Sequence, residues 1–221
     1  MPLKAPAPAP VPISWTGLYL GVSAGAAFQS HSDTYGYGVF FDPIQNTATT
    51  TGFIGGGQIG YNFQSGAFVY GIEGDFSGLT GKTHTHGLST PFLAGGNYTG
   101  QLSWLATARG RFGVAIGDTM PYFTAGVAFT RVNHMILVPP GSLTSLTYSD
   151  TSVRTGLVLG GGIEHMITRN WTVKFEGLWV DAGEKIVAAG NLPAGTANPA
   201  AKTSKFSDHA IIARAGLNYK F

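Results

Sequence analysis

Charged side chains in this sequence recur at every second position inside segments that are otherwise apolar or glycine-rich. The charged residues that share this pattern are Glu73, Asp75, Arg109, Arg111, Glu164, Lys174, Glu176, Arg214 and Lys220. A spacing of two places side chains on the same face of an extended strand. The set holds nearly equal numbers of acids and bases, and an isolated charge away from water is costly. We therefore predict a network of internal salt bridges; a path for protons or ions along the same residues is the alternative.

The histidines offer one further candidate site. His84 and His86 are the close pair among six histidines, and on an extended segment they face the same way. Such a pair can bind a metal or the iron of haemin, although plain polar surface is the simpler interpretation. The chain has no cysteine, which excludes thiol catalysis and Cys-based metal sites. Because no nucleophile, base and acid stand together, we expect no enzyme, no metal site and no cofactor other than haemin.

Two glycine triplets, at residues 55–57 and 160–162, have the composition of a phosphate-binding loop. No lysine of the P-loop type follows either triplet, and no helix is predicted to begin there. Glycine inside a strand instead allows close approach of neighbouring groups. We interpret both triplets as relief of crowding inside a narrow barrel.

Composition places these residues in an unusual setting. Charged residues make up 11% of the chain, against about 25% in a typical soluble domain. No apolar run reaches the length of about 18 residues that a membrane helix needs. Low charge, 33 glycines and 12% aromatic residues instead fit a barrel whose apolar surface is spread over alternating strands. The net charge of +2 gives no sign of a nucleic-acid partner.

Strict alternation defines the elements that must position the charges. It covers residues 15–28, 51–63, 68–77, 101–114, 121–131, 154–165, 171–181 and 206–221. A tilted membrane strand needs about 9–11 residues, and short connections alternate with long ones. The sequence thus predicts an all-β, transmembrane, antiparallel up-and-down barrel of eight strands, with short periplasmic turns and four long extracellular loops. We expect the barrel at residues 14–221 and a Pro/Ala-rich periplasmic leader at 1–13, with the numbering beginning near the mature end of an exported chain.

The two faces of these strands differ in a way that fixes their orientation. Charges share their face with most glycines, whereas Phe, Trp, Tyr, Leu, Ile and Val occupy the other face. An eight-stranded barrel has room inside only for side chains, so the charged face should point inward and the bulky face toward lipid. Aromatic residues near the strand ends predict a girdle at the membrane interfaces. They are Trp15, Tyr61, Phe63, Phe68, Trp104, Trp171, Trp179, Tyr219 and Phe221.

Three motifs resemble a known family. They are the opening at residues 15–21 (WTGLYLG), the strand start at 170–176 (NWTVKFE) and the ending at 214–221 (RAGLNYKF). Together they are similar to the small OmpA-like outer-membrane barrels of alphaproteobacteria, which include surface antigens, members called porins and haemin-binding members. The resemblance implies an integral outer-membrane location, and it implies that Phe221 is a signal for the barrel assembly machinery. His165 departs from the aromatic residue expected at its position.

These observations lead to one main functional hypothesis and two alternatives. The main one is a structural outer-membrane protein that anchors in lipid and lipopolysaccharide and displays surface loops, with a lumen plugged by salt bridges. A small-solute pore is the first alternative, suggested by the porin members of the family. A receptor that binds haemin through His84 and His86 is the second. The sequence names no partner for the loops.

Overall fold

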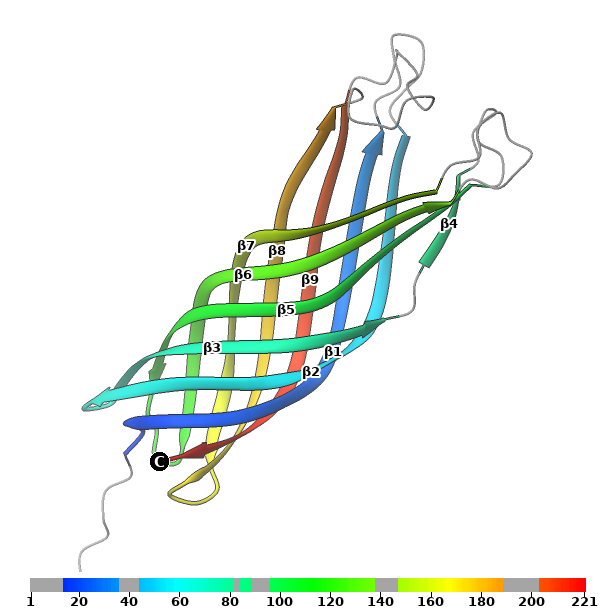
Figure 1. Cartoon of the computed structure of the whole chain (residues 1–221). Helices are drawn as coiled ribbons and strands as arrows, with labels where there is room; N and C mark the ends of the chain where they lie inside the picture. The colour runs from blue at the N-terminus through cyan, green and yellow to red at the C-terminus, as the bar shows by residue number, and fades with distance from the viewer. Residues whose placement is uncertain (1–13, 36–43, 82–83, 89–95, 138–146, 189–202) are drawn as a thin grey trace, which may run out of the picture.

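The chain forms a β-barrel in the computed structural model, which describes residues 14–35, 44–81, 84–88, 96–137, 147–188 and 203–221 (Figure 1). The strands are β1 (Gly17–Tyr35), β2 (Ile44–Ser65), β3 (Phe68–Gly81), β4 (His84–Leu88), β5 (Gly96–Val114), β6 (Thr119–Leu137), β7 (Thr147–Met166), β8 (Trp171–Ala188) and β9 (Thr203–Lys220). In these described ranges there is no helix long and apolar enough to span a membrane.

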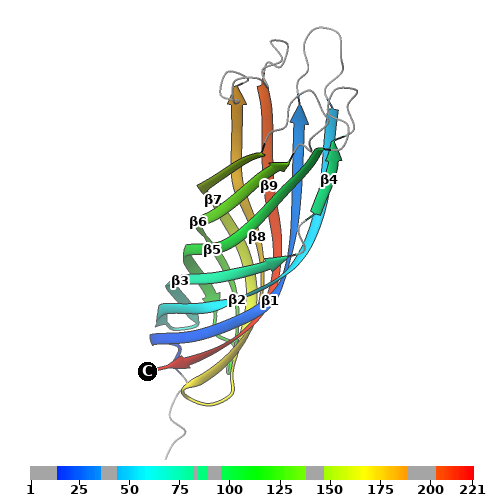
Figure 2. The same cartoon turned by 45° about the vertical axis from the view of Figure 1, so that its right-hand side comes forward.

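Eight of the strands close into a ring. Hydrogen-bonded neighbours follow the order β3-β2-β1-β9-β8-β7-β6-β5, and a further pairing of β3 with β5 joins the two ends. Each pairing of the ring is antiparallel. Closure leaves no free edge inside the membrane, where an unpaired backbone group is very costly. The predicted fold, an eight-stranded antiparallel barrel, is confirmed (Figures 1 and 2).

Three connections at one end of the barrel are short turns. They join β2 to β3 at Gly66, β5 to β6 at Gly117, and β7 to β8 at residues 167–170. Gly66 and Gly117 both adopt a φ of 62°, which favours glycine. The last strand ends on this same side, as Figure 1 shows at the label of the C-terminus. We call this side the short-turn end and the opposite side the loop end.

The strands are longer than the alternation predicts, and the excess lies at the loop end. β1 continues to Tyr35 and β2 begins at Ile44, where polar residues carry no hydrophobic alternation. Register shifts in β5 at Leu102/Trp104 and in β8 at Asp181/Glu184 break the alternation where the predicted segments begin and end. A bulge inserts an extra residue and so exchanges the two faces of a strand. The short β4, which pairs with β5 beyond the ring, was not predicted.

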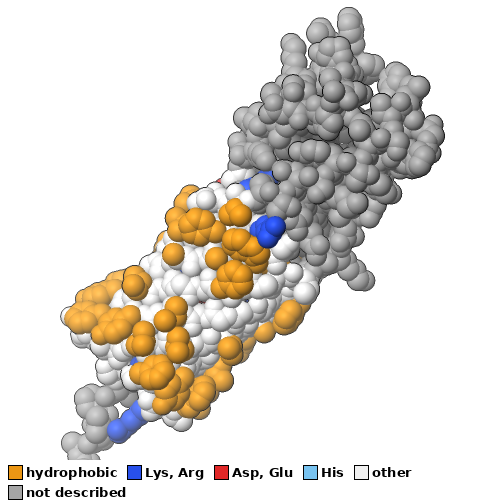
Figure 3. All heavy atoms as spheres, in the orientation of Figure 1, with side chains coloured by type: hydrophobic (Ala, Val, Ile, Leu, Met, Phe, Trp, Pro, Cys, Tyr) orange, Lys and Arg blue, Asp and Glu red, His pale blue; other side chains and the backbone are white. Residues whose placement is uncertain are grey.

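The two faces of the wall have opposite character. Every strand of the ring carries large apolar side chains on its outward face, and many of them are about half exposed or more. Figure 3 shows these side chains spread over the described wall, with Lys and Arg at its two ends. Inward positions hold the buried charges and the buried apolar residues. A wall that is apolar outside and charged inside matches a barrel in lipid and not a soluble barrel.

Candidate functional site: the charged lumen

The centre of the lumen holds a compact group of acidic and basic side chains. Eight of the nine charged residues singled out in the sequence lie here, namely Glu73, Asp75, Arg109, Arg111, Glu164, Lys174, Glu176 and Arg214, and each is buried. Four are acids and four are bases, so their formal charges cancel. Alternation on β3, β5, β7, β8 and β9 points all of them inward. We call this group the lumen network.

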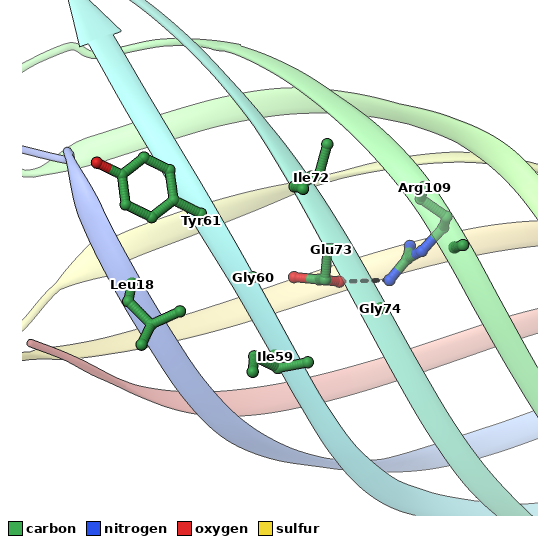
Figure 4. Close-up of a pocket in the computed structure, with 9 residues that line it drawn as sticks. Leu18, Ile59, Gly60, Tyr61, Ile72, Glu73, Gly74 and Arg109 are labelled. Atoms are coloured by element: carbon green, nitrogen blue, oxygen red, sulfur yellow. Dashed lines mark hydrogen bonds and ion pairs between the residues drawn. The ribbon is translucent and has the colours of Figure 1, made fainter.

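Glu73 is the most heavily contacted acid of the lumen network. Lys174 Nζ donates to both of its carboxylate oxygens, at 2.9 and 3.0 Å. Arg109 Nη2 donates to Glu73 Oε1, as the dashed line in Figure 4 shows, and Arg111 Nη1 lies 3.4 Å from Oε2. The hydroxyl of Tyr19 donates to the same Oε2 at 2.7 Å. Five contacts from four residues satisfy the lone pairs that burial would otherwise leave without partners.

Asp75 and Glu176 share two arginines between them. Arg214 Nε donates to Glu176 Oε2 at 2.7 Å, and its Nη1 donates to Asp75 Oδ1 at 3.0 Å. Arg109 bridges the same two acids: its Nη1 donates to Glu176 Oε1 at 2.9 Å, and its Nη2 donates to Asp75 Oδ2 at 3.0 Å. The planar guanidinium, with its fixed fork of donors, suits such bridging between two carboxylates.

Arg111 connects this group to the short-turn end. Its Nη2 donates to Glu164 Oε2 at 2.6 Å, and its Nη1 donates to the hydroxyl of Tyr19 at 2.7 Å. The guanidinium carbon lies 4.1 Å from the ring centroid of Tyr122, a cation–π geometry. The hydroxyl of Tyr122 in turn donates to Glu176 Oε1 at 3.0 Å. Each buried charge of the network therefore has partners from several strands.

Polar neighbours complete the network, and sequence reasoning missed them. Thr107 donates to Asp75, Thr172 and Asn218 donate to Glu164, and Gln58 donates to Asn218. Together with Tyr19 and Tyr122 they occupy inward positions on β1, β2, β5, β6, β8 and β9. The available signal was their alternation phase, because each lies an even number of residues from an inward charge or glycine on its own strand.

Lys220 corrects the predicted network. It is half-buried at the end of β9, and its Nζ donates to the backbone oxygen of Ser14. Its alternation phase is inward, but the strand ends there, so the side chain reaches the mouth of the barrel and not its centre. Lys220 thus ties the last strand to the segment that enters the first.

Trp15 corrects the predicted girdle. It is 1% exposed and packs inside the barrel with Val69, Met120, Tyr122 and Met166, which we call the lower apolar layer. Its backbone amide donates to Gln64 Oε1 at 2.8 Å, which holds the residue just before β1. Trp15 shares the alternation phase of Tyr19 and not that of Leu18, and for this reason it points inward.

A second apolar group lies on the other side of the lumen network. This upper apolar layer consists of Ala27, Ile54, Leu79, Leu105, Ala128, Val158, Leu178, Val180, Ala210 and Ile212. Every strand of the ring contributes to it. Inward positions of β3 thus run from Val69 through Glu73 and Asp75 to Leu79, from apolar to charged to apolar. The alternation of the sequence predicts only charges and small residues in the lumen, and these two layers were not predicted.

The remaining girdle residues lie on the outward face. Tyr61, Phe63, Phe68, Trp171, Trp179, Tyr219 and Phe221 are exposed, and Trp104 is half-buried. Near the short-turn end, Phe63 stacks on Tyr70 with ring centroids 5.9 Å apart, and Trp171 meets Tyr219 edge-on at 5.1 Å. Toward the loop end, Trp104 lies 5.7 Å from Phe76. Aromatic residues therefore stand at both ends of the apolar wall.

A shallow depression of about 590 Å³ lies in the wall of β1, β2, β3 and β5. Figure 4 shows Leu18, Ile59, Tyr61 and Ile72 around it, beside the contact between Glu73 and Arg109. Leu18, Ile59, Tyr61 and Ile72 are all exposed on the outward face, so the depression opens toward lipid.

The histidine pair cannot be placed as a site. His84 and His86 belong to β4 and lie opposite Gly100 and Tyr98 of β5, but their side chains lie outside the described residues. Within the part of the chain that the structure describes, no three His, Cys, Asp or Glu residues are grouped as metal ligands. Residues 1–13, the predicted leader, also lie outside the described residues.

Comparison with known proteins agrees with this geometry. A family model described as "Outer membrane protein beta-barrel domain" matches residues 3–221. The chain is 34% identical to the 31 kDa outer-membrane immunogenic protein of Brucella melitensis, covering 100% of this chain and 89% of that one. It is 30% identical to a 22 kDa outer membrane protein of Rhizobium leguminosarum, over 78% and 66% of the two chains.

Among solved structures, the outer membrane protease OmpT of Escherichia coli superposes with a TM-score of 0.50 at 12% identity, covering 93% of this chain and 97% of that one. At this identity the likeness concerns the fold alone. The family match covers nearly the whole chain, and both relatives are named as outer-membrane proteins. This chain belongs to the outer-membrane β-barrel family and is an integral protein of the outer membrane.

Proposed function

We propose that this protein is a structural, non-enzymatic anchor of the outer membrane whose lumen is closed to solutes and whose loop end displays the connections between strands. The observation that carries the proposal is the order of layers in the lumen. Charged side chains of the network that form ion pairs are 0–3% exposed. They lie between two buried apolar layers.

Three filled layers in series argue against a pore for two separate reasons. An ion that enters an apolar layer loses its hydration and finds no compensating group there. An ion that reaches the lumen network meets four acids already paired with four bases. Opening a path thus requires a change in the apolar layers as well as in the salt bridges.

Planar-bilayer conductance of the refolded chain tests this proposal. We expect silence from the wild type and also from Arg109→Ala, because the upper apolar layer persists when one salt-bridge donor is lost. Combining Arg109→Ala with Ile54→Ala and Leu105→Ala, which thin the upper layer, and with Trp15→Ala, which thins the lower layer, should produce channels. Ile59→Ala replaces an outward apolar residue of β2 and serves as the matched control for Ile54→Ala.

One outcome would contradict the closed lumen, and another would contradict the role of the apolar layers in closing it. Steady wild-type channels would show that the network lines a pore. Channels from Arg109→Ala alone would show that salt bridges, and not the apolar layers, close the barrel. Each refolded variant is first checked for resistance to SDS in unheated gels, so that silence is scored only for folded barrels.

Two partners accompany this proposal. Outer-membrane lipid covers the outward apolar wall, since exposed apolar area of this extent is not stable in water. The barrel assembly machinery recognises the aromatic residue Phe221, which is 65% exposed and directly follows β9.

A further inference from the structure

Outward side chains change character at a definite level near the loop end. The first polar outward residues beyond the apolar wall are exposed, and they are Thr51 on β2, Thr80 on β3 and Arg131 on β6. Toward the short turns, the next large outward residues are apolar, namely Phe53, Phe76 and Phe129. Because hydrocarbon gives way to headgroups where apolar surface ends, these polar residues mark the headgroup level of the outer leaflet.

Arg131 differs from the other residues at this level. It is exposed, and among the described residues it makes no hydrogen bond or ion pair. Asp181, a half-buried outward acid on β8, accepts a hydrogen bond from the backbone amide of Gly183 at 3.0 Å. Every arginine of the lumen network is paired with carboxylates. Arg131 is thus an outward cation whose donors are not taken by any residue in the part of the chain that the structure describes.

The surface around Arg131 is apolar. In the register of the sheet it lies opposite Trp104 of β5 and Val153 of β7, and Phe129 precedes it by two residues on the same face. Val153 is 60% exposed and Phe129 is 38% exposed. A single guanidinium therefore stands at the headgroup level, bordered on three sides by side chains that suit acyl chains. We call this group the Arg131 patch.

We propose that the Arg131 patch binds a phosphorylated glycolipid of the outer leaflet, with the guanidinium of Arg131 on a phosphate of lipid A and the first acyl segment on Trp104, Phe129 and Val153. A guanidinium pairs with phosphate through two parallel hydrogen bonds, and it does so more strongly where water is scarce. Basic side chains at a membrane surface attract anionic lipid. The inference rests on the outer-membrane location and is independent of whether the lumen is closed.

Binding of fluorescent lipid A to the full chain, refolded in zwitterionic detergent, tests the proposal. We expect Arg131→Gln to weaken binding by about tenfold, the loss of a charge-assisted pair. Arg131→Lys should lose less, because a lysine keeps the charge without the bidentate geometry. Arg169→Gln is the matched control: Arg169 is an exposed arginine of the turn before β8, at the opposite end of the barrel, and its loss should leave binding unchanged.

The source of the phosphate is resolved by two further arms. The first arm uses dephosphorylated lipid A, which should bind the wild type as weakly as intact lipid A binds Arg131→Gln. The second adds inorganic phosphate at millimolar concentration, which should not displace lipid A from the wild type. Equal losses in Arg131→Gln and Arg169→Gln would reduce the effect to general charge attraction and overturn the site. Equal affinity for the dephosphorylated lipid would overturn the phosphate contact, and displacement by inorganic phosphate would assign the patch to a free anion. Conductance plays no part in these readouts, so failure of the closed-lumen proposal would be seen separately.

Discussion

Lys174 and Glu73 meet across the lumen, with the Nζ of the lysine 2.9 and 3.0 Å from the two carboxylate oxygens. They come from β8 and β3, which are not neighbours in the ring. This contact therefore does not follow from strand pairing but from the narrowness of the barrel, which brings opposite walls within reach of two side chains. It joins the two halves of the wall through the centre of the lumen network.

Breaking this contact should destabilise the barrel strongly. Lys174→Met leaves the four acids with three bases, and an uncompensated buried charge costs about 3–5 kcal/mol. The double variant Lys174→Met, Glu73→Gln should cost less than the sum of the two single variants, because the charges are again balanced. The measurement is unfolding in guanidinium, followed by the loss of SDS-resistant mobility.

Lys220→Met supplies the control for that experiment. Lys220 is half-buried, and among the described residues its ammonium group hydrogen-bonds only to the backbone oxygen of Ser14, so its loss should change stability by less than about 1 kcal/mol. Strictly additive losses for Lys174 and Glu73 would show that the contact across the lumen is not energetically coupled.

Trp15 should behave as an interior residue in quenching experiments. We expect a brominated detergent, which resides in the hydrophobic belt, to quench Trp171 and to leave Trp15 largely unquenched, because Trp15 is 1% exposed and Trp171 is 43% exposed on the outward face. Comparing Trp15→Phe with Trp171→Phe separates the two signals. If Trp15→Phe and Trp171→Phe reduce quenching equally, Trp15 faces lipid and belongs to the girdle.

Trp15→Ala should also lower stability, by about 3–5 kcal/mol, since truncation of a buried aromatic residue leaves a cavity. Trp171→Ala is the comparison, because an outward aromatic residue is replaced by lipid or detergent. Unfolding by guanidinium measures both, and equal losses would contradict a packing role for the lower apolar layer.

Two glycines of the wall predict opposite responses to alanine. A Cβ at Gly126 of β6 would lie 2.0 Å from the backbone oxygen of Ala108 and 2.7 Å from the Cα of Arg109, whereas a Cβ at Gly177 of β8 would meet no atom within 4 Å. Gly126→Ala should therefore impair refolding or stability, and Gly177→Ala should be tolerated. The fraction of refolded, SDS-resistant protein decides between them. Tolerance at both positions would mean that the strands around Arg109 can separate without cost.

Phe221 should matter for assembly in cells more than for the stability of the folded barrel. Its ring is 65% exposed and contacts Tyr219 edge-on at 5.1 Å, while its backbone amide donates to Leu18 at 3.0 Å. Phe221→Ser keeps that backbone bond and removes the aromatic signal. We expect normal refolding in detergent and a reduced amount in the outer membrane. Unchanged amounts in the outer membrane would exclude Phe221 as the signal.

The sequence predicted the wall well because alternation is a local signal. Glu73 and Arg109 were assigned to one network since they point inward on consecutive predicted strands, and the structure pairs β3 with β5 so that they lie opposite each other. The contact between Lys174 and Glu73 could not be predicted in this way, because it depends on the tilt and stagger of strands on opposite walls.

Other differences have equally local causes. Tyr19 and Tyr122 share the inward phase of their strands, but their hydroxyl contacts depend on the neighbours present at each level of the lumen. Trp15 was assigned by its residue type, although its phase pointed inward. Ends of β5 and β8 were misplaced because bulges exchange the faces of a strand.

β1 pairs with β9 along almost its whole length. Ser14 and Lys220 are in contact, and Phe221 is bonded to Leu18, so the two ends of the barrel domain adjoin at the same rim. One covalent link between these two ends would make the chain of strands cyclic. A short peptide joining position 221 to position 14, with a new opening placed in the connection at 138–146, would keep every strand pairing described above. Such circular permutation would start the chain at the loop end and let a fused probe emerge on that side of the membrane.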